Sequence, residues 1–287
     1  MVKITDKLNN LVTVYFSYNR PMQLDLALTT NRVCSKNHMY QEEVVLYKTD
    51  EERFSNAYEI VTKEHPSVSF IKENNFKDDL NNIIKNKKYV MFVVDDCIFT
   101  QDYYIEGIIS ILDNFLEAVG FSLRLGTNTK YCYPLYKNNP LPRFFYDVGF
   151  NKRMMGFSWK EVPDGDFSYP LELSSSVYRV NNVKSIIEKT NYNNPNELEH
   201  ILSMNLHLYA ERLPYLLSFK KSVAFCNPVN KVRAGNNNRS WNNDKYSVDN
   251  LLDLFERGYR IDYERFYGFV SSGCHQEAEF FLKGLQE

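Results

Sequence analysis

The sequence predicts an α/β protein with a doubly wound, mostly parallel central sheet that is flanked by helices. In the first half of the chain, short apolar runs alternate with segments of helical periodicity, which is typical of parallel sheets. The apolar runs end at polar or turn residues, as expected where buried strands reach the edge of a sheet. The chain has 287 residues, of which 44% are hydrophobic, so one large core is available.

Four strands are predicted in the first half, with a helix after each of the first three. The third helix is expected from about Asn75 to Ile84. In chain order, the predicted strands are Leu11–Phe16, Glu43–Tyr47, Val68–Ile71 and Tyr89–Val94. Because ligands bind beyond the carboxyl ends of parallel strands, a site is expected at Ser17–Arg20, Lys48–Asp50 and Asp95–Cys97.

The second half is less regular. Residues 131–170 are rich in Tyr, Pro, Asn and Phe, which favours short strands and long loops. The remaining elements are predicted as a helix at Asn196–Leu217, a strand at Val223–Asn230, a polar loop at Asn236–Asp244, a helix at Val248–Gly258 and a largely helical tail at Asp262–Leu285.

Composition excludes several classes of protein. The formal net charge of -2 argues against a nucleic-acid partner, which would call for a basic excess on one face. Five cysteines without a CxxC pair favour reduced thiols. The N-terminal residues contain no apolar leader, and no run has the length of a transmembrane segment. A soluble cytoplasmic protein is expected, with peripheral membrane contact left open.

An acidic pair, Asp95 and Asp96, directly follows the most apolar predicted strand. Two adjacent carboxylates repel each other unless a positive group lies beside them. Mg²⁺ and Mn²⁺ prefer oxygen ligands and are often held by one or two carboxylates together with phosphates. The alternative is a turn that caps the next helix through its dipole. No GxGxxG follows the first strand and no GxxxxGK[ST] occurs, so a nucleotide would need a holder other than a glycine-rich loop.

In the order and spacing of its motifs, the chain resembles the glycosyltransferases of the GT-A fold, in particular the large family-two group of bacterial and viral members. The resemblance spans roughly residues 11 to 280. The matching segments are Tyr15–Pro21 (YFSYNRP), Val44–Asp50, Val90–Phe99, Phe121–Thr129 (FSLRLGTNT), Tyr169–Leu171, Asn194–Glu199 (NPNELE), Asn227–Arg233 (NPVNKVR) and Cys274–Glu277.

The resemblance implies a donor site in the first half of the chain. Ser17, Asn19 and Arg20 would line the nucleotide pocket, and Asp50 would contact the base or ribose. Asp95 would face the ribose or the metal, and Asp96 would be the likeliest direct ligand of Mn²⁺ or Mg²⁺, with His275 completing the metal shell. The sequence departs from the usual DxD pattern at Cys97, because a neutral thiol is a poor ligand for either ion.

In inverting members of the family, a carboxylate at the start of a helix removes the proton from the acceptor hydroxyl. Glu199 is the first candidate, Glu197 the second, and the third rank is Asp164, Asp166 and Glu172. A capping box with Asn196 as N-cap and Glu199 at the third helical position is an equally good reading of this segment. A carboxylate at a helix N-terminus is also expected to have a lowered pKa.

Two basic positions complete the predicted donor site. Arg124 is placed to reach the donor sugar or phosphate, although an exposed salt bridge is the alternative. Arg233 precedes a polar loop with Arg239 and Trp241, and such loops can close over a diphosphate. For Arg239 and Trp241, a plain exposed loop is at least as good a reading.

The predicted function is metal-assisted transfer of a sugar from a UDP-, dTDP- or GDP-linked donor to a hydroxyl of a glycan acceptor, with inversion expected from the resemblance. Residues 1–287 would form a single catalytic domain, with a nucleotide-sugar-binding half (1–130) and an acceptor-binding half (131–287). Glycoside hydrolysis by two carboxylates is a rival enzyme activity. A catalytically inactive nucleotide- or glycan-binding module with the same fold is the alternative from another class, and it rests on Cys97.

Overall fold

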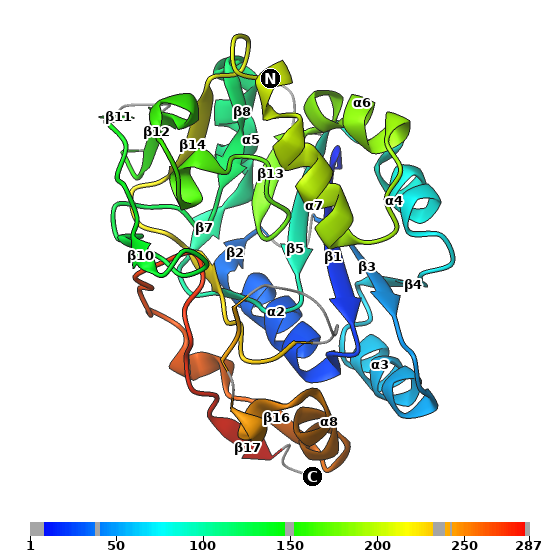
Figure 1. Cartoon of the computed structure of the whole chain (residues 1–287). Helices are drawn as coiled ribbons and strands as arrows, with labels where there is room; N and C mark the ends of the chain where they lie inside the picture. Colours follow the sequence, from blue (N-terminus) through cyan, green and yellow to red (C-terminus); the bar gives the residue numbers. More distant parts are fainter. Residues whose placement is uncertain (1–8, 38–40, 147–151, 232–238, 242, 285–287) are drawn as a thin grey trace.

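The computed structural model describes residues 9–37, 41–146, 152–231, 239–241 and 243–284, which form a nine-stranded sheet with helices on both faces (Figure 1). The strand order is β11-β12-β14-β8-β13-β5-β1-β3-β4. These strands are β1 (Leu11–Tyr18), β3 (Glu42–Lys48), β4 (Ser69–Lys72), β5 (Tyr89–Val94), β8 (Ala118–Ser122), β11 (Phe144–Tyr146), β12 (Met154–Ser158), β13 (Ser176–Arg179) and β14 (Tyr215–Phe219).

Most strands of this sheet run in one direction. β13 pairs antiparallel with both β5 and β8, and β12 pairs antiparallel with both β11 and β14. The other pairings are parallel. Reversal is therefore confined to β12 and β13, and the predicted mostly parallel α/β sheet is confirmed. The four strands predicted in the first half correspond to β1, β3, β4 and β5.

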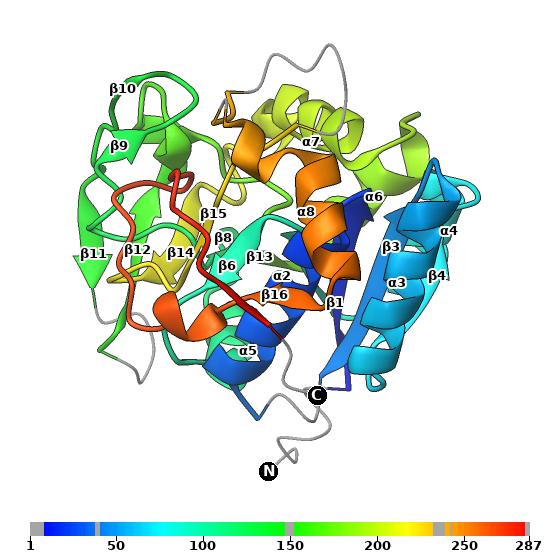
Figure 2. The same ribbon diagram turned by 90° about the horizontal axis from the view of Figure 1, so that it is seen from below.

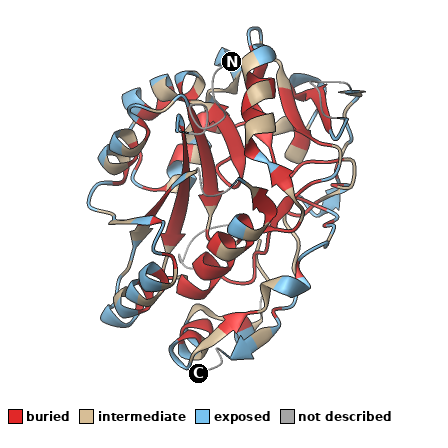
Figure 3. Cartoon of the chain, turned by 180° about the vertical axis from the view of Figure 1, so that it is seen from behind, coloured by how far each residue is buried: buried red, intermediate tan, exposed pale blue. Residues whose placement is uncertain are grey.

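Helices cover both faces because the residues of the central strands alternate between two cores. On β1, Leu11 and Tyr15 belong to one core, whereas Val12, Val14 and Phe16 belong to the other. The first core is covered by α2 (Pro21–Cys34), α3 (Glu52–Glu64), α5 (Ile105–Asn114) and α8 (Val248–Glu256), and the second by α4 (Phe76–Ile84), α6 (Val180–Lys189) and α7 (Pro195–Met204). Figure 3 shows buried strands between helices whose outer faces are exposed.

Four two-stranded sheets attach the peripheral segments. They are β2 (Ser35–Lys36) with β7 (Tyr103–Tyr104), β6 (Cys97–Phe99) with β15 (Ala224–Cys226), β9 (Tyr131–Cys132) with β10 (Lys137–Asn138), and β16 (Tyr259–Ile261) with β17 (Leu282–Gly284). The view from below shows α8 on the same side of the sheet as α2 and α3 (Figure 2). Arg53 of α3 forms ion pairs with Asp253 and Glu256 of α8.

Two predictions for the second half are wrong. The helix predicted at Asn196–Leu217 ends at Met204, and Tyr215–Phe219 forms the sheet strand β14 after Pro214. Within residues 262–284 of the tail predicted as largely helical, the structure describes only one short 3-10 turn, Tyr263–Arg265, and the strand β17. Tyr263, Phe266, Phe269 and Phe280 pack on the first core, and the positive φ of Gly268 interrupts any helix there. The strand β13 was not predicted.

Among the described residues, no helix combines the length and the apolar character needed to cross a bilayer.

We expect Gly120→Ala to destabilise the fold, because a Cβ atom at Gly120 on β8 would lie 2.6 Å from the ring of Tyr178 on β13. That ring cannot move freely, since its hydroxyl is hydrogen-bonded to the carbonyl oxygen of Glu172 at 2.7 Å. Denaturant unfolding should show a loss of roughly 1–3 kcal/mol, as for overpacked cores. Gly284→Ala is the control, because nothing lies within 4 Å of its Cβ position. Equal stability of the two variants would contradict the tight β8–β13 contact.

Candidate active site

A cavity of about 630 Å³ lies at the carboxyl ends of β1, β3 and β5, and residues from both halves of the chain form its wall. Asn19, Asp50 and Glu197 are not in its lining, and Arg233 lies outside the described residues. The predicted site residues that do line the cavity are Ser17, Arg20, Asp95, Asp96, Arg124, Asp164, Asp166, Glu172, Glu199 and His275. The structure thus brings most of the predicted residues together.

The acidic pair forms the turn between β5 and β6. Oδ2 of Asp95 accepts hydrogen bonds from the Ser17 hydroxyl at 3.0 Å and from the Tyr18 amide at 3.2 Å. Nη1 of Arg20 lies 3.0 Å from Oδ1 of Asp95 and 3.5 Å from Oδ2 of Asp96. Asp95 is therefore held by three donors, whereas Asp96 has a longer ion pair. Burial raises the pKa of Asp96, while the charge of Arg20 opposes the shift and that of Asp95 adds to it.

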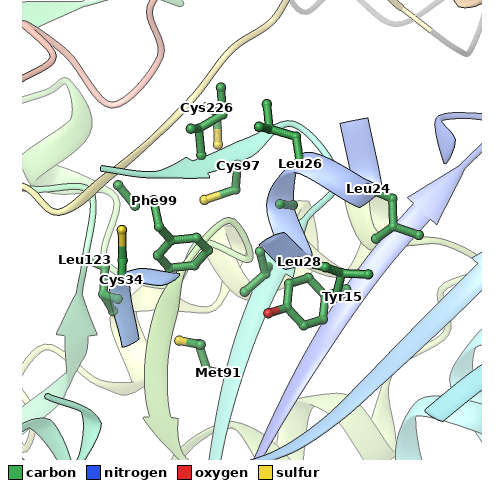
Figure 4. Close-up of a cluster of buried hydrophobic side chains, with 14 of the residues drawn as sticks. Tyr15, Leu24, Leu26, Leu28, Cys34, Met91, Cys97, Phe99, Leu123 and Cys226 are labelled. Atoms are coloured by element: carbon green, nitrogen blue, oxygen red, sulfur yellow. The ribbon is translucent and has the colours of Figure 1, made fainter. Parts of the chain in front are cut away.

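Cys97 belongs to the core and not to the cavity. Its side chain is fully buried in the first core, near Cys226 and Phe99 (Figure 4). β6 pairs with β15 so that Cys97 lies opposite Cys226. Because Cys97 lies in the core and is not in the cavity lining, the departure from the DxD pattern at this position does not alter the oxygen groups that face the cavity.

Asn19 and Asp50 form a small cluster at the edge of the site. The Asn19 side chain accepts a hydrogen bond from the Asp50 amide at 3.2 Å, and its Nδ2 donates to Oδ2 of Asp50 at 3.4 Å. Asn19 has a φ of 53°, a left-handed conformation that asparagine tolerates better than most residues. The hydroxyl of Tyr18, which lines the cavity, donates to Asp50. Asp50 thus reaches the cavity through Tyr18.

The capping box of α7 involves different residues from those predicted. Asn194 is the N-cap, and its Oδ1 accepts a hydrogen bond from the amide of Glu197 at 3.0 Å. Oε1 of Glu197 in turn accepts from Nδ2 of Asn194 at 2.7 Å, and Oε2 accepts from the amide of Asn193 at 2.8 Å. Glu197 therefore has a capping role at the exposed helix start, and Asn196 and Glu199 are not the capping pair.

Glu199 lies two residues after Glu197 on α7, in the cavity wall. Oε1 accepts a hydrogen bond from the amide of Leu173 at 3.0 Å. The predicted lowering of its pKa is wrong. Burial raises the pKa to about 7, since the single amide and the charge of Arg124 only partly compensate the loss of water. A carboxylate with this pKa is suited to accept a proton near neutral pH.

Glu172 is engaged in a buried ion pair with Arg124. Nη2 of Arg124 lies 2.8 Å from Oε2 of Glu172, and both side chains are about 5% exposed. The Ser174 amide and the Ser176 hydroxyl also donate to this carboxylate. Because both oxygens are already occupied, Glu172 is better placed to orient Arg124 than to remove a proton from a ligand.

His275 is next to Arg124. Nε2 of His275 lies 3.3 Å from Nη1 of Arg124, and Nδ1 is buried without a hydrogen-bond partner in the described part of the chain. Burial, assisted by the Arg124 charge, lowers the pKa of His275 to about 3. Within the described residues, no three His, Cys, Asp or Glu side chains are grouped so that they could hold a metal ion.

Sequence reasoning missed or underrated several lining residues. Asp166 has a pKa raised to about 6, chiefly by burial, although it was only a third-rank candidate. The guanidinium of Arg239 lies between two tyrosine rings, 3.7 Å from the centre of Tyr133 and 4.0 Å from that of Tyr136. Arg239 is therefore held at the cavity wall and is not in a plain exposed loop. No local motif marks these tyrosines, so only the fold could identify them.

No protein-family model matches the chain. The sequence is 29% identical to the bifunctional glycosyltransferase pgtA of Dictyostelium discoideum over 214 residues, which cover 67% of this chain and 28% of that protein. The chain therefore spans less than a third of this relative. Over the aligned segment the chain is homologous to a glycosyltransferase.

Solved structures with similar folds also include glycosyltransferases. Residues 1–349 of TarS from S. aureus match with a TM-score of 0.47 and 14% identity, covering 76% of this chain and 60% of that one. The same TarS segment in complex with UDP gives a TM-score of 0.44 and 13% identity, with 73% and 60% coverage. The mannosyltransferase PcManGT from Pyrobaculum calidifontis, in complex with GDP-Man and Mn²⁺, gives 0.32 and 11%, with 45% and 42% coverage. At these identities the likeness concerns the fold alone.

The capping of α7 can be tested by two asparagine substitutions. Asn194→Ala should lower the free energy of unfolding by about 1 kcal/mol, because it leaves the Glu197 amide without its acceptor. Asn196→Ala is the matched control on the exposed side of the same helix start and should change stability by less than about 0.5 kcal/mol. Chemical denaturation of both variants measures the difference. A larger loss from Asn196→Ala would place the helix start two residues later.

Proposed function

We propose that the chain is a metal-assisted, inverting glycosyltransferase of the family-two GT-A type, which moves a sugar from a nucleoside-diphosphate sugar to a hydroxyl of a glycan acceptor. The observation that carries the proposal is one cavity that contains both the acidic pair beside Arg20 and the carboxylate of Glu199. The homology to a glycosyltransferase supports it. Because both chain halves line this cavity, we further propose a single catalytic domain over residues 1–287, with donor-binding (1–130) and acceptor-binding (131–287) halves.

The charge of the cavity wall supports the need for a divalent cation. The acidic side chains of the lining outnumber the basic ones, so additional positive charge would favour the binding of a diphosphate there. The acids are Glu73, Asp95, Asp96, Asp164, Asp166, Glu172 and Glu199, and the bases are Arg20, Lys48, Arg124, Lys231 and Arg239. A bound Mn²⁺ or Mg²⁺ would supply charge that stabilises the diphosphate leaving group.

Asp96 is the best candidate to hold such an ion. Its ion pair to Arg20 is long, whereas both oxygens of Asp95 already accept from closer donors. One carboxylate together with phosphate oxygens is a common way to bind Mg²⁺. Such a site is complete only when the donor is present, which agrees with the lack of a three-residue metal cluster among the described residues.

The remaining donor contacts follow from position in the cavity. Ser17 and Arg20 at the end of β1 would contact the nucleotide, and Asn19 with Asp50 would reach the base or ribose beside Tyr18. Arg124 would contact phosphate or donor sugar. Arg233 remains a predicted phosphate contact. UDP, dTDP and GDP are the nucleotides to test, because the proposed contacts to the base do not favour one of the three.

Glu199 is the proposed base. It would take the proton of the acceptor hydroxyl as that oxygen attacks the anomeric carbon, and its pKa of about 7 matches this task at neutral pH. Glu197 is committed to the helix cap, and Glu172 to Arg124. The burial of Cys97 in the core supports an active enzyme over an inactive module with the same fold, because this residue does not take part in the cavity.

We expect UDP, dTDP or GDP to raise the thermal unfolding midpoint in the presence of Mn²⁺, because a ligand that binds only the folded state stabilises it by mass action. At a hundred times the Kd the gain is about 2.7 kcal/mol. Mn²⁺ alone should give a much smaller shift. Asp96→Asn should keep the fold and lose the part of the nucleotide shift that depends on Mn²⁺. A full Mn²⁺-dependent shift in this variant would rule out Asp96 as the metal ligand.

We expect Glu199→Gln to lower turnover about a hundredfold or more without weakening donor binding, since a base acts in the transition state. In the wild-type protein, kcat/KM should rise with pH through about 7, where Glu199 becomes ionised. The variant should also be more stable at pH 8. A folded-state pKa raised above the unfolded value means that stability falls as pH rises between the two values, and glutamine removes this loss.

Glu197→Gln is the matched control on the same helix. It should reduce stability through the cap while leaving turnover per folded molecule near the wild-type value. Release of sugar from the donor, with water as acceptor, provides an assay that needs no known glycan. Wild-type turnover in Glu199→Gln, or a pH profile without a rise near 7, would exclude Glu199 as the base.

A further inference from the structure

The mouth of the cavity is marked by the lining residues that are also exposed to solvent. They are Lys48, Pro134, Leu135, Pro163, Asn196 and Lys231. The donor groups proposed above lie deeper, since Ser17 is 7% and Asp95 is 5% exposed. Because the donor would occupy the floor of the cavity, an acceptor would reach Glu199 through the mouth, and the exposed lining residues are the ones that it would contact.

An apolar surface extends from this mouth onto the outside of the molecule. Leu135 lines the cavity and is 49% exposed, whereas Tyr136, the next residue, is 66% exposed and lies outside the lining. We call these two side chains the Leu135–Tyr136 shelf. Because both are open to solvent, a ligand can contact them without any movement of the chain. The shelf thus offers one contact inside the mouth and a second contact beyond it.

The shelf lies on a strained turn. The amide of Tyr136 donates to the carbonyl oxygen of Tyr133 at 3.3 Å and closes a four-residue turn between β9 and β10. Tyr136 has a φ of 53°, a left-handed conformation that is a genuine outlier for so bulky a residue. Such strain persists only where the surroundings enforce it, and it is concentrated at ligand-binding sites. The turn therefore needs a contact that holds the exposed ring in place.

Arg239 provides that contact. Its guanidinium lies 3.7 Å from the ring centre of Tyr133 and 4.0 Å from that of Tyr136. Nη1 of Arg239 donates to the Tyr131 hydroxyl at 3.2 Å and to the carbonyl oxygen of Tyr133 at 3.1 Å, and the Tyr133 hydroxyl donates to Glu277. One face of the Tyr136 ring is thus covered by a cation. Since two thirds of the residue is exposed, the other face is open to a ligand.

The polar groups at the same mouth favour a sugar over a lipid. Asn196 is exposed and precedes Glu199 by three residues, so both lie on one side of α7. The Asn196 amide can donate to one hydroxyl and accept from another. The Asp164 side chain, which is 46% exposed, also lines the cavity. A lipid chain would remove water from these groups without replacing their hydrogen bonds, whereas a sugar ring presents hydroxyls at its edge and C–H groups on its faces.

We infer that the acceptor is an oligosaccharide of hexose units, whose reacting sugar lies at the mouth between Leu135 and Asn196 and whose second sugar packs on the open face of Tyr136. This inference rests on the proposed function for the role of the ligand as acceptor, and it adds the number of sugars that the chain recognises. The C–H face of the second sugar would cover apolar surface that folding leaves exposed. An acceptor of two or more sugars should therefore bind better than a single sugar.

The dependence of binding on sugar number tests this inference on the full chain, in Mn²⁺ with UDP, dTDP and GDP in turn. Affinities of lactose, cellobiose and mannobiose are measured by ligand-observed NMR and compared with those of methyl β-galactoside, methyl β-glucoside and methyl α-mannoside. We expect at least one disaccharide to bind about tenfold more tightly than its hexoside, a gain typical of one additional ring contact.

Two substitutions at Tyr136 and one at Leu135 separate the two contacts of the shelf. Tyr136→Ala should bind the disaccharide no more tightly than the hexoside, because the second sugar has lost its ring contact. Tyr136→Phe should keep the disaccharide gain, since packing on the ring does not need the hydroxyl. Leu135→Ser should weaken the binding of hexosides and disaccharides alike, because Leu135 contacts the first sugar.

Tyr146→Ala is the matched control. Tyr146 is 48% exposed and has Nζ of Lys220 4.9 Å from its ring centre, but it is not part of the cavity lining. The variant should keep the disaccharide gain of the wild type. Octyl β-glucoside, used below its micellar concentration, probes for a lipid. If it binds more tightly than methyl β-glucoside and Tyr136→Ala abolishes the difference, the shelf receives a lipid chain and the inference is wrong.

The inference also fails if no disaccharide binds more tightly than its hexoside, or if Tyr136→Phe loses the gain. The shift of the unfolding midpoint by nucleotide and Mn²⁺ keeps the proposed function apart from it. If the wild type shows that shift but no disaccharide gain, the shelf alone is refuted. If the wild type shows a gain that depends on Tyr136 but no shift with any nucleotide, the donor role fails and the oligosaccharide site stands.

Discussion

The site depends on one interaction, the contact of the Arg20 guanidinium with two adjacent carboxylates at the end of β5. This cation offsets the repulsion between the Asp95 and Asp96 carboxylates. The same guanidinium donates to the carbonyl oxygen of Asn230 and so connects the acidic turn to the segment that follows β15. One side chain thus supplies the charge balance and the link between the two halves of the cavity. The turn between β1 and α2 places Arg20 beside the acidic pair, since Pro21 begins α2 directly after it.

At the other side of the cavity, the carboxylates of Glu172 and Glu199 differ in their hydrogen-bond partners. Glu172 accepts from Arg124, Ser174 and Ser176, whereas Glu199 has a single amide partner and a pKa of about 7. Glu172 is therefore occupied as the partner of Arg124, whereas Glu199 is suited to exchange a proton near neutral pH. Arg124 takes part in two contacts of this wall. It forms the ion pair with Glu172, and it also contacts the ring of His275.

The first half of the fold and the acidic turn could be predicted, because apolar runs of strand length followed by polar turns leave few alternatives. The second half could not. Tyr215–Phe219 is an apolar run that fits a helix or a buried strand equally well, and only its pairing with β8 and β12 decides. In the tail, Tyr263, Phe266 and Phe269 repeat every third residue and imitate a helix. The cap of α7 was misplaced because NPNELE offers two asparagines, each followed three residues later by glutamate. The raised pKa of Glu199 depends on burial, to which distant segments contribute, and burial has no local signature.

The hydrogen bond between Arg20 and Asn230 joins residues 210 positions apart. Contacts of such long range form late, because the entropy of closing a large loop must be overcome first. During synthesis on the ribosome, β1 and β5 emerge long before Asn230 does, so the acidic turn exists for a time without its complete set of partners. The nascent chain therefore passes through a stage in which the central strands can pair while the wall of the cavity that Asn230 and later residues form is still missing.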